Sequence, residues 1–299
     1  MRQNRCHISV CICSYKRPEL LAKLLTSLED QDSTGIFTYS VVVVDNDQMG
    51  SAEKTVEDFR MRSSISISYH IEQEQNIALA RNKAVANANS DFIAFIDDDE
   101  LPEKTWLVSL YMTCIDYHAD GVLGPVVPYY EVDAPEWVVR GKFFERPSHR
   151  TGEVLHWINT RTGNVLLRRG IFDNGENLFM EQFGRGGEDT DFFRRMIGKG
   201  FRFVWCEEAP VYEAVTAQRC RRSFLLRRAL LRGRQPYFTK IDYAKSFVAV
   251  PLYTMALPFL LAVGHHIFMK YLIKDFDHIG RLLALCGIDV IKENYVSGR

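Results

Sequence analysis

Two clusters of acidic side chains are the clearest candidates for chemistry in this 299-residue chain. One cluster is Asp97, Asp98 and Asp99, and the other is Glu188, Asp189 and Asp191. Carboxylate oxygens are the ligands that hard divalent cations prefer. Three adjacent carboxylates also repel one another, so a bound cation would explain why an apolar run ends in them. The alternative for the first cluster is an Asp-rich turn at a solvated loop tip.

The second cluster predicts a different task. A carboxylate at Asp189 could act as a general base that removes the proton from an acceptor hydroxyl. Glu188 or Asp191 would then bind hydroxyl groups of the acceptor. The alternative is that these side chains only favour a helix start, where acidic residues are common. Together the clusters would suit sugar transfer from a nucleoside diphosphate, whose departure a divalent cation assists.

The pattern of apolar residues predicts the elements that position these clusters. We expect strands at 8–14, 39–44, 65–71 and 92–96, and helices at 19–28, 76–88 and 106–118. Strands that alternate with helices indicate an α/β fold with a doubly wound, mostly parallel sheet, which binds ligands at the carboxyl ends of its strands. A long irregular stretch at 131–151 is typical of a lid or a binding loop.

The final third of the chain has a different composition. Residues 246–269 include no Asp, Glu, Lys or Arg and have the length of a bilayer-spanning helix, although Pro251 and Pro258 interrupt them. The segment could span the membrane, re-enter it or lie on its surface, and a buried helical hairpin is the alternative. We therefore expect a catalytic domain over 1–235 and a membrane-associated helical region over 236–299.

Basic residues precede this apolar segment. Eight lie between Ala214 and Lys240, with no acidic residue among them. Such a flank is expected on the cytoplasmic side of a membrane, where it meets anionic lipid. Arginine also matches phosphate geometry, so the same residues could hold a diphosphate. The residues concerned are Arg219, Arg221, Arg222, Arg227 and Arg228.

The bulk composition argues against other classes of protein. A net charge of -1 gives no general attraction to nucleic acid, and the basic stretch lacks interleaved aromatic residues. Seven cysteines without paired spacings fit a reducing compartment better than a disulfide framework. The chain begins with polar residues and lacks an N-terminal apolar segment typical of a secretion signal. We expect the catalytic part to lie in the cytosol.

In their order along the chain, six motifs resemble family 2 inverting glycosyltransferases, and more narrowly bacterial exopolysaccharide glucosyltransferases of the succinoglycan type. The resemblance covers about residues 7–235. The motifs are VCICSYKRPELL at 10–21, VDN at 44–46, ARN at 80–82, FIDDD at 95–99, TGN at 162–164 and GEDTD at 187–191.

The resemblance implies a GT-A fold, a nucleotide-sugar donor, which we expect to be a UDP-sugar, and a Mg²⁺ or Mn²⁺ ion. It places the nucleobase at Tyr15 and Asp45, with Arg81 steadying the base or the diphosphate. Alternatives are that Tyr15 caps the edge of the core and that Arg81 is a surface helix residue. The other expected donor-binding residues are Ser14, Arg17, Asp97 at the ribose and Asp98.

The resemblance also assigns the metal and the catalytic base. Asp99 would hold the metal with help from Asp97, and Asp189 matches the catalytic base. Many relatives have a histidine ligand where this chain has Glu213, which would be an equally hard ligand. Asn164 lies in the expected acceptor region.

The predicted reaction is a single displacement in which the acceptor hydroxyl attacks the anomeric carbon and UDP departs. The acceptor would be a lipid-linked sugar or oligosaccharide, as in surface polysaccharide synthesis. One alternative is a membrane-attached nucleotide-sugar sensor without turnover. Another is a nucleotidyltransferase, although the run 14–18 lacks the glycine-rich loop expected there.

Overall fold

The computed structural model describes residues 5–131, 133–173, 175, 178–184, 186–233 and 238–288. The chain divides into two compact units. The first comprises Met1–Val127 and Arg146–Glu213, and the second comprises Pro128–Glu145 and Ala214–Arg299. The domain boundary expected between residues 235 and 236 falls outside the described residues and stays a prediction.

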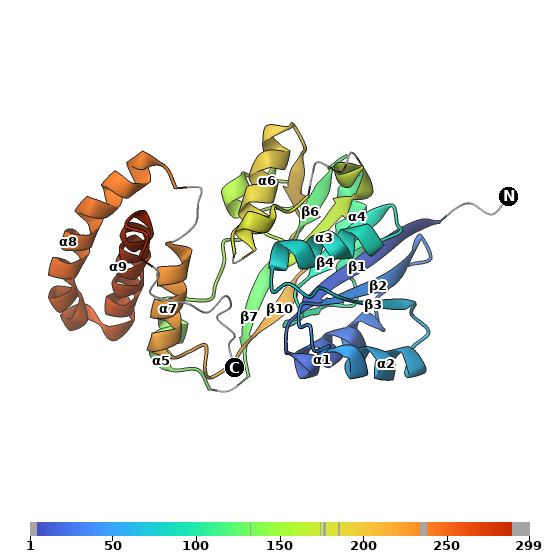
Figure 1. The fold of residues 1–299 in the computed structure, drawn as a ribbon, viewed down its shortest axis with the longest axis horizontal. Coiled ribbons are helices and arrows are strands. Elements are labelled where there is room, and N and C mark those ends of the chain that lie inside the picture. Colours follow the sequence, from blue (N-terminus) through green and yellow to red (C-terminus); the bar gives the residue numbers. More distant parts are fainter. Residues whose placement is uncertain are drawn as a thin grey trace. The chain divides into compact units, whose positions relative to one another are not determined.

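A mixed sheet forms the centre of the first unit (Figure 1). Its seven described strands have the order β3-β2-β1-β4-β8-β6-β9. They are β1 (Cys6–Ser14), β2 (Phe37–Asp45), β3 (Ile67–Ile71), β4 (Phe92–Ile96), β6 (Gly121–Leu123), β8 (Asn164–Arg168) and β9 (Phe203–Trp205). Strands β3, β2, β1 and β4 run parallel, whereas β8 is antiparallel to both β4 and β6. The predicted α/β fold with a mostly parallel sheet is confirmed, and β8 is its antiparallel member.

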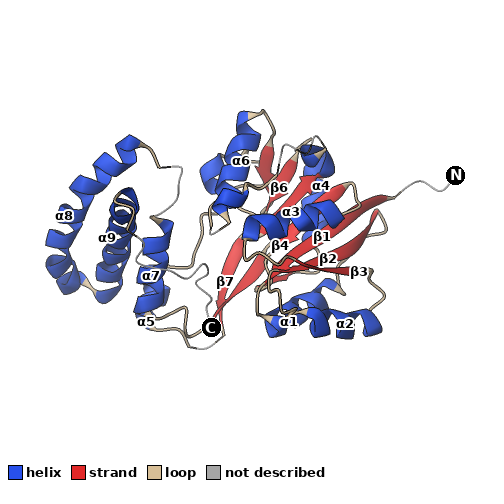
Figure 2. Ribbon diagram, in the orientation of Figure 1, coloured by secondary structure: helices blue, strands red, loops and turns tan. Residues whose placement is uncertain are grey.

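Helices cover both faces of this sheet (Figure 2). Buried residues of α1, α2 and α4 pack in one core cluster, and those of α3 and α6 pack in another. These helices are α1 (Pro18–Leu28), α2 (Glu53–Arg62), α3 (Ile77–Asn87), α4 (Trp106–Asp116) and α6 (Glu188–Gly198). Continuous apolar strands such as 41–44 are buried because both of their faces are covered.

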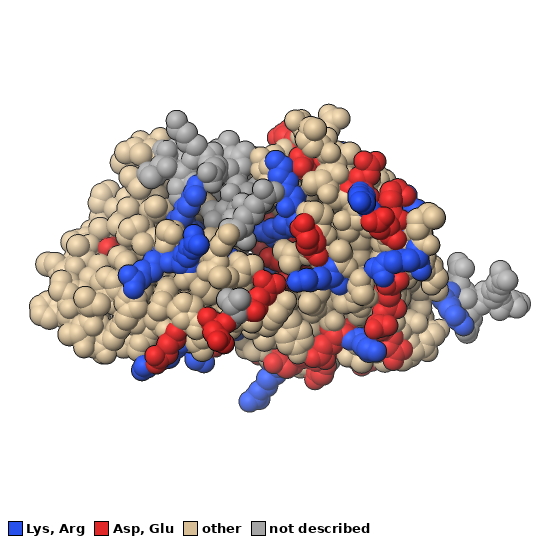
Figure 3. Space-filling model, turned by 90° about the horizontal axis from the view of Figure 1, so that it is seen from below, with Lys and Arg blue, Asp and Glu red and all other residues tan. Residues whose placement is uncertain are grey.

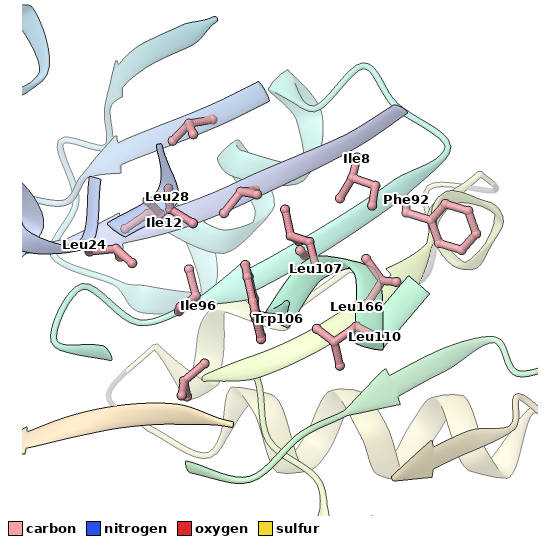
Figure 4. Packing of buried hydrophobic residues seen from close by; sticks show 14 of the residues in the cluster. Ile8, Ile12, Leu24, Leu28, Phe92, Ile96, Trp106, Leu107, Leu110 and Leu166 are labelled. Atoms are coloured by element: carbon pink, nitrogen blue, oxygen red, sulfur yellow. The ribbon is translucent and has the colours of Figure 1, made fainter. Parts of the chain in front are cut away.

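Local sequence explains where these helices begin and what they bury. Pro18 occupies the first turn of α1, where its missing N–H costs nothing. The leucines of α1 recur at helical spacing, and Figure 4 shows Leu24 and Leu28 against Ile12 of β1. Asn76 precedes α3 as its N-cap, because its side chain accepts hydrogen bonds from the amides of Ala78 and Leu79.

A short antiparallel pairing lies beside the main sheet. Strand β5 (Glu100–Pro102) follows the Asp97–Asp99 cluster directly and pairs with β10 (Val211–Val215), so that Glu100 lies opposite Glu213. Strand β7 (Val126–Tyr130) also joins β10. The stretch expected to be irregular contains one short helix, α5 (Glu136–Gly141), which belongs to the second unit.

The other described helices of the second unit are α7 (Arg222–Arg232), α8 (Lys240–Val263) and α9 (His265–Leu285). The apolar segment expected at 246–269 is therefore not one element, because α8 ends before Gly264 and α9 begins after it. Polar contacts join the two helices: Thr254 donates to Asp275 over 3.1 Å, and Ser246 bonds His278 over 3.0 Å. Both prolines lie inside α8 without ending it.

Candidate active site

The first acidic cluster lies at the carboxyl end of β4, beside the end of β1. Ser14 donates to Oδ2 of Asp98 over 2.8 Å. Arg17 lies 3.0 Å from Oδ1 of Asp98 and 3.3 Å from Oδ2 of Asp99. Three residues expected to bind the donor, namely Ser14, Arg17 and Asp98, are thus brought together. Asp98 is buried, and burial raises its pKa to about 7 against the opposing effect of Arg17.

Asp45, at the carboxyl end of β2, is fully buried and held by its own chain. Its Oδ2 accepts from the Ala52 amide over 2.7 Å and from the Tyr69 hydroxyl over 3.0 Å, while Oδ1 accepts from the Asp47 amide. Both oxygens are therefore occupied, and the nucleobase contact stays a prediction. Tyr15 is half-buried, with Lys16 over its ring, which leaves part of the ring exposed.

Arg81 of α3 joins the two acidic clusters. Its guanidinium forms a hydrogen-bonded ion pair with Glu188, and its Nη2 lies 3.6 Å from Oδ1 of Asp97. The Arg81 side chain is buried, so the alternative of a surface helix residue is wrong. Burial raises the pKa of Glu188 to about 7, although Arg81 opposes this shift.

Asp189 and Asp191 begin α6 but have different surroundings. Gly187, with φ of 90°, precedes the helix in the left-handed region that favours glycine. Asp189 is half-buried, and its Oδ1 accepts from the Thr190 amide over 2.6 Å. Asp191 accepts from Arg195 one turn further along the helix, over 2.8 Å. Asp189 is thus placed beside Glu188, whereas Asp191 is engaged on its own helix.

Asn164, expected near the acceptor, is 1% exposed and uses its whole side-chain amide within the fold. Its Oδ1 accepts from Trp106 Nε1 over 2.8 Å. Its Nδ2 donates to the carbonyls of Pro125 and Ala209 over 3.0 and 2.8 Å. These bonds favour a positioning role over the expected contact with the acceptor.

Glu100 and Arg146 extend the site beyond the predicted residues. Glu100 is 1% exposed, and its Oε2 accepts from the Asp97 amide over 3.1 Å. Its Oε1 is buried without a hydrogen-bond partner in the described structure, and burial together with Asp97 raises its pKa well above the ordinary value. Arg146 donates to Glu213 over 2.6 Å. The predicted metal ligand Glu213 is therefore engaged by an arginine.

The donor set fits a hard divalent cation in its chemistry. Burial raises the pKa values of Asp97 and Glu100, and Asp99 and Glu213 lie close enough to add to both shifts. Glu100 supplies an oxygen that no described group satisfies. Among the described residues, however, no three His, Cys, Asp or Glu side chains are gathered tightly enough to form a metal-binding group.

Comparison with known proteins decides the family. The model of Glycosyl transferase family 2 matches residues 9–175. The succinoglycan biosynthesis protein ExoM of Rhizobium meliloti is 37% identical over 232 residues, which cover 76% of this chain and 73% of that protein. This chain belongs to glycosyl transferase family 2. The family resemblance read from the six motifs is confirmed, and the chain is a glycosyltransferase.

Other relatives agree with this assignment. The glucosyl-dolichyl phosphate glucuronosyltransferase of Haloferax volcanii is 26% identical over 215 residues, 68% of this chain and 61% of that protein. The crystal structure of S. aureus TarS 1-349 in complex with UDP has a TM-score of 0.53 at 17% identity, over 98% of this chain and 95% of that one. The likeness to TarS shows a shared fold. A nucleotide-sugar donor follows for this glycosyltransferase from its family.

The basic residues expected at a phosphate or a membrane belong to the second unit of the glycosyltransferase. Arg219 is buried: its Nη1 donates to the Ala214 carbonyl over 3.0 Å, and its guanidinium lies over the ring of Phe144. Arg221 and Arg222 are exposed, just before and at the start of α7. Arg227 and Arg228, on α7, are half-buried. The two exposed arginines are the better candidates for contact with lipid.

Some residues near the site were not predicted from the sequence, and only one of them had a signal that could have revealed it. Glu100 directly follows the Asp triplet and could have been included with it. Arg146 and Arg161 lie in or just after the irregular stretch, where no periodicity shows which residues approach the site. Only the tertiary structure identifies them.

Proposed function

We propose that this glycosyltransferase is an inverting enzyme that transfers a sugar from a UDP-sugar to a hydroxyl of a lipid-linked saccharide during bacterial exopolysaccharide synthesis. The observation that carries the proposal is the position of Asp189, half-buried at the start of α6 and next to the Arg81-bound Glu188. Asp189 would take the proton of the attacking hydroxyl. The kinship with ExoM supports the pathway.

The donor would bind along the carboxyl ends of β1, β2 and β4. Tyr15 and Asp45 would hold the nucleobase and Asp97 the ribose. Ser14, Arg17 and Asp98 already form one hydrogen-bonded group at this edge, which would support the donor site. Arg81 contacts both Asp97 and Glu188 and would so keep the donor and acceptor sides of the site at a constant distance from each other.

A divalent ion, when bound, would neutralise the departing diphosphate. We propose Asp99 as its main ligand, with Asp97 and Glu213 as further ligands. Arg146 engages Oε2 of Glu213, so binding of the ion at that oxygen requires this hydrogen bond to open. The unsatisfied Oε1 of Glu100 would complete the oxygen set.

We further propose that α8 attaches the enzyme to a membrane surface. Among the described residues, α8 alone is long and apolar enough to cross a membrane, and only 6% of its most apolar window is buried. On the face drawn in Figure 3, the part of the second unit formed by α8 and α9 shows few charged residues. The exposed large apolar side chains of α8 are Ile241, Phe247, Val248, Leu252, Met255, Phe259, Leu261 and Val263.

A surface-lying orientation fits α8 better than a spanning one. Its partner α9 is joined to it by Asp275 and His278, and carries exposed Lys270 and Lys274. If α8 spanned a bilayer, these ionisable side chains of α9 would enter the hydrocarbon core with it, which has a high free-energy cost. Lysines are also the only exposed charged residues on the two described helices, which suits an anionic leaflet. We propose the cytoplasmic leaflet.

Membrane attachment can be tested by sedimentation of the full chain with vesicles that contain anionic lipid. Phe259→Glu should reduce vesicle binding about tenfold or more, because Phe259 is 76% exposed on α8. Met61→Glu, at an equally exposed apolar position on α2, is the matched control. Equal binding by both variants would contradict attachment through α8.

The catalytic proposal is tested by UDP release from a panel of UDP-sugars with lipid-linked acceptors, in Mn²⁺ or in EDTA. Asp189→Asn should lower kcat by about 10²–10⁴ while UDP still binds. Asp191→Asn, which removes a neighbouring carboxylate that is engaged by Arg195, should retain most activity. Unchanged turnover in Asp189→Asn would refute its role as base. UDP binding without turnover of any donor would favour a sensor.

A further inference from the structure

A small cavity in the first unit has an unusual concentration of cationic and hydrogen-bonding groups. It lies beside β6 and β9, under the segment that leads into β8. Its volume is about 20 Å³. The residues that line it are Leu123, Gly124, Val126, Arg146, Pro147, His149, Asn159, Arg161 and Trp205.

Two arginines share this cavity. Arg146 is occupied on one side by Glu213, whereas Arg161 forms no ion pair within the described part of the chain. Burial and the neighbouring Arg146 lower the pKa of Arg161, and Asp189, Glu213 and Glu100 oppose this effect. Two guanidinium groups in one partly buried space are better accommodated when an anion lies between them.

His149 adds a third polar group to the cavity. Its Nδ1 bonds Oε1 of Glu153 over 2.7 Å, which fixes the ring, and the ring makes a T-shaped contact with Trp205. The other ring nitrogen, Nε2, is buried without a hydrogen-bond partner among the described residues. When the ring is protonated, Nε2 is a further donor. A buried and unsatisfied ring nitrogen indicates that a ligand group or a water completes the cavity.

The size and position of the cavity limit what can enter. A volume of about 20 Å³ admits a group of a few atoms and excludes a sugar ring. Planar guanidinium groups match a carboxylate with two parallel hydrogen bonds. The cavity shares Arg146 with Glu213, which lies opposite Glu100 of the candidate site.

We propose that this cavity binds the carboxylate of an acidic sugar, such as a hexuronate, and holds that sugar beside the Arg146–Glu213 pair of the candidate site. This inference rests on the proposed function, because the carboxylate would belong to the sugar of either the donor or the acceptor. The sugar ring would remain outside the cavity, and only the carboxylate would enter between Arg146 and Arg161.

The test measures binding to the purified full chain. With UDP bound, glucuronate, glucose and glucose 6-phosphate are compared as acceptor-side probes. UDP-glucuronate and UDP-glucose are compared as donor-side probes. The wild type should bind the uronate of one pair about tenfold more tightly than the neutral sugar. Arg161→Gln should remove this preference. Arg150→Gln, at an exposed position of the same segment outside the cavity, should retain it.

The outcomes separate this proposal from the proposed function. A uronate preference that Arg161→Gln abolishes supports the carboxylate site, and the responding pair assigns it to donor or acceptor. No preference in either pair, with normal UDP binding, overturns the carboxylate site and leaves the glycosyltransferase mechanism standing. Equal or tighter binding of glucose 6-phosphate overturns the choice of a carboxylate. Loss of UDP binding in the wild type would count against the proposed function itself.

Discussion

Arg81 on α3 and Glu188 at the start of α6 form a buried ion pair between residues 107 positions apart in the chain. The same guanidinium lies 3.6 Å from Asp97. One arginine therefore links the acidic cluster at the end of β4 to the one at the start of α6. The distance between the proposed donor and acceptor sides depends on this link.

Arg81→Met should lower the free energy of unfolding by about 3–5 kcal/mol, because it leaves the buried Glu188 without its partner. Urea denaturation measures the change. Arg62→Met is the matched control, since the Arg62–Glu29 pair is partly exposed to solvent and should contribute less than about 1 kcal/mol. Similar small losses in both variants would contradict a stabilising role for the Arg81–Glu188 pair.

Stability should fall as the pH rises from about 4 to 7. Asp98 and Glu188 have pKa values of about 7 in the folded protein, above the unfolded values of about 3.9 and 4.3. The folded state therefore binds more protons than the unfolded state in this window. For each extra proton bound, the free energy of unfolding falls by up to about 1.4 kcal/mol for every unit by which the pH rises. Chemical denaturation at pH 5, 6 and 7 measures the slope. Asp98→Asn should flatten it, whereas an unchanged slope would contradict the raised pKa of Asp98.

Gly163→Ala should damage the site although it adds only one carbon. A Cβ atom at this position would lie 2.7 Å from Oε1 of Glu100 and 3.1 Å from Oδ2 of Asp97. We expect a fall in kcat with little loss of stability, because the clash displaces carboxylates rather than the core. Gly198→Ala, with open space around its Cβ, is the control and should leave kcat unchanged. Full activity in Gly163→Ala would show that Glu100 and Asp97 can move freely.

Arg146→Gln should increase the affinity for Mn²⁺, because it releases Glu213 from its 2.6 Å hydrogen bond. Isothermal titration calorimetry of the purified protein with Mn²⁺ measures this affinity without any turnover. Arg140→Gln, which removes an arginine from an exposed pair, should have no effect. Weaker Mn²⁺ binding in Arg146→Gln would count against Glu213 as a metal ligand.

The sequence revealed the parts of this fold that local patterns control. Continuous apolar runs predicted β1, β2 and β4, and the polar residues that follow them marked the ligand-binding edge of the sheet. The pattern of apolar residues could not show that Arg81 is buried, because α3 has no clear apolar stripe. The partner of Arg81 is Glu188 of α6, which is distant in the sequence. The pattern also could not show that Asn164 is engaged by Trp106, since that contact joins residues 58 positions apart. Such long-range contacts leave no periodic signal in the sequence.

The antiparallel direction of β8 has a consequence for how such enzymes diversify. Because Asn164 pairs with Ile96, the segment before β8 arrives at the same edge of the sheet where the Asp97–Asp99 cluster begins. The segment from Arg146 to Gly163 is thus bound to β9 through Gly152 and Leu155 and delivered to that edge by the β4–β8 pairing. Substitutions at its end are therefore a route to altering the substrate pocket of such enzymes while the carboxylates of β4 stay unchanged.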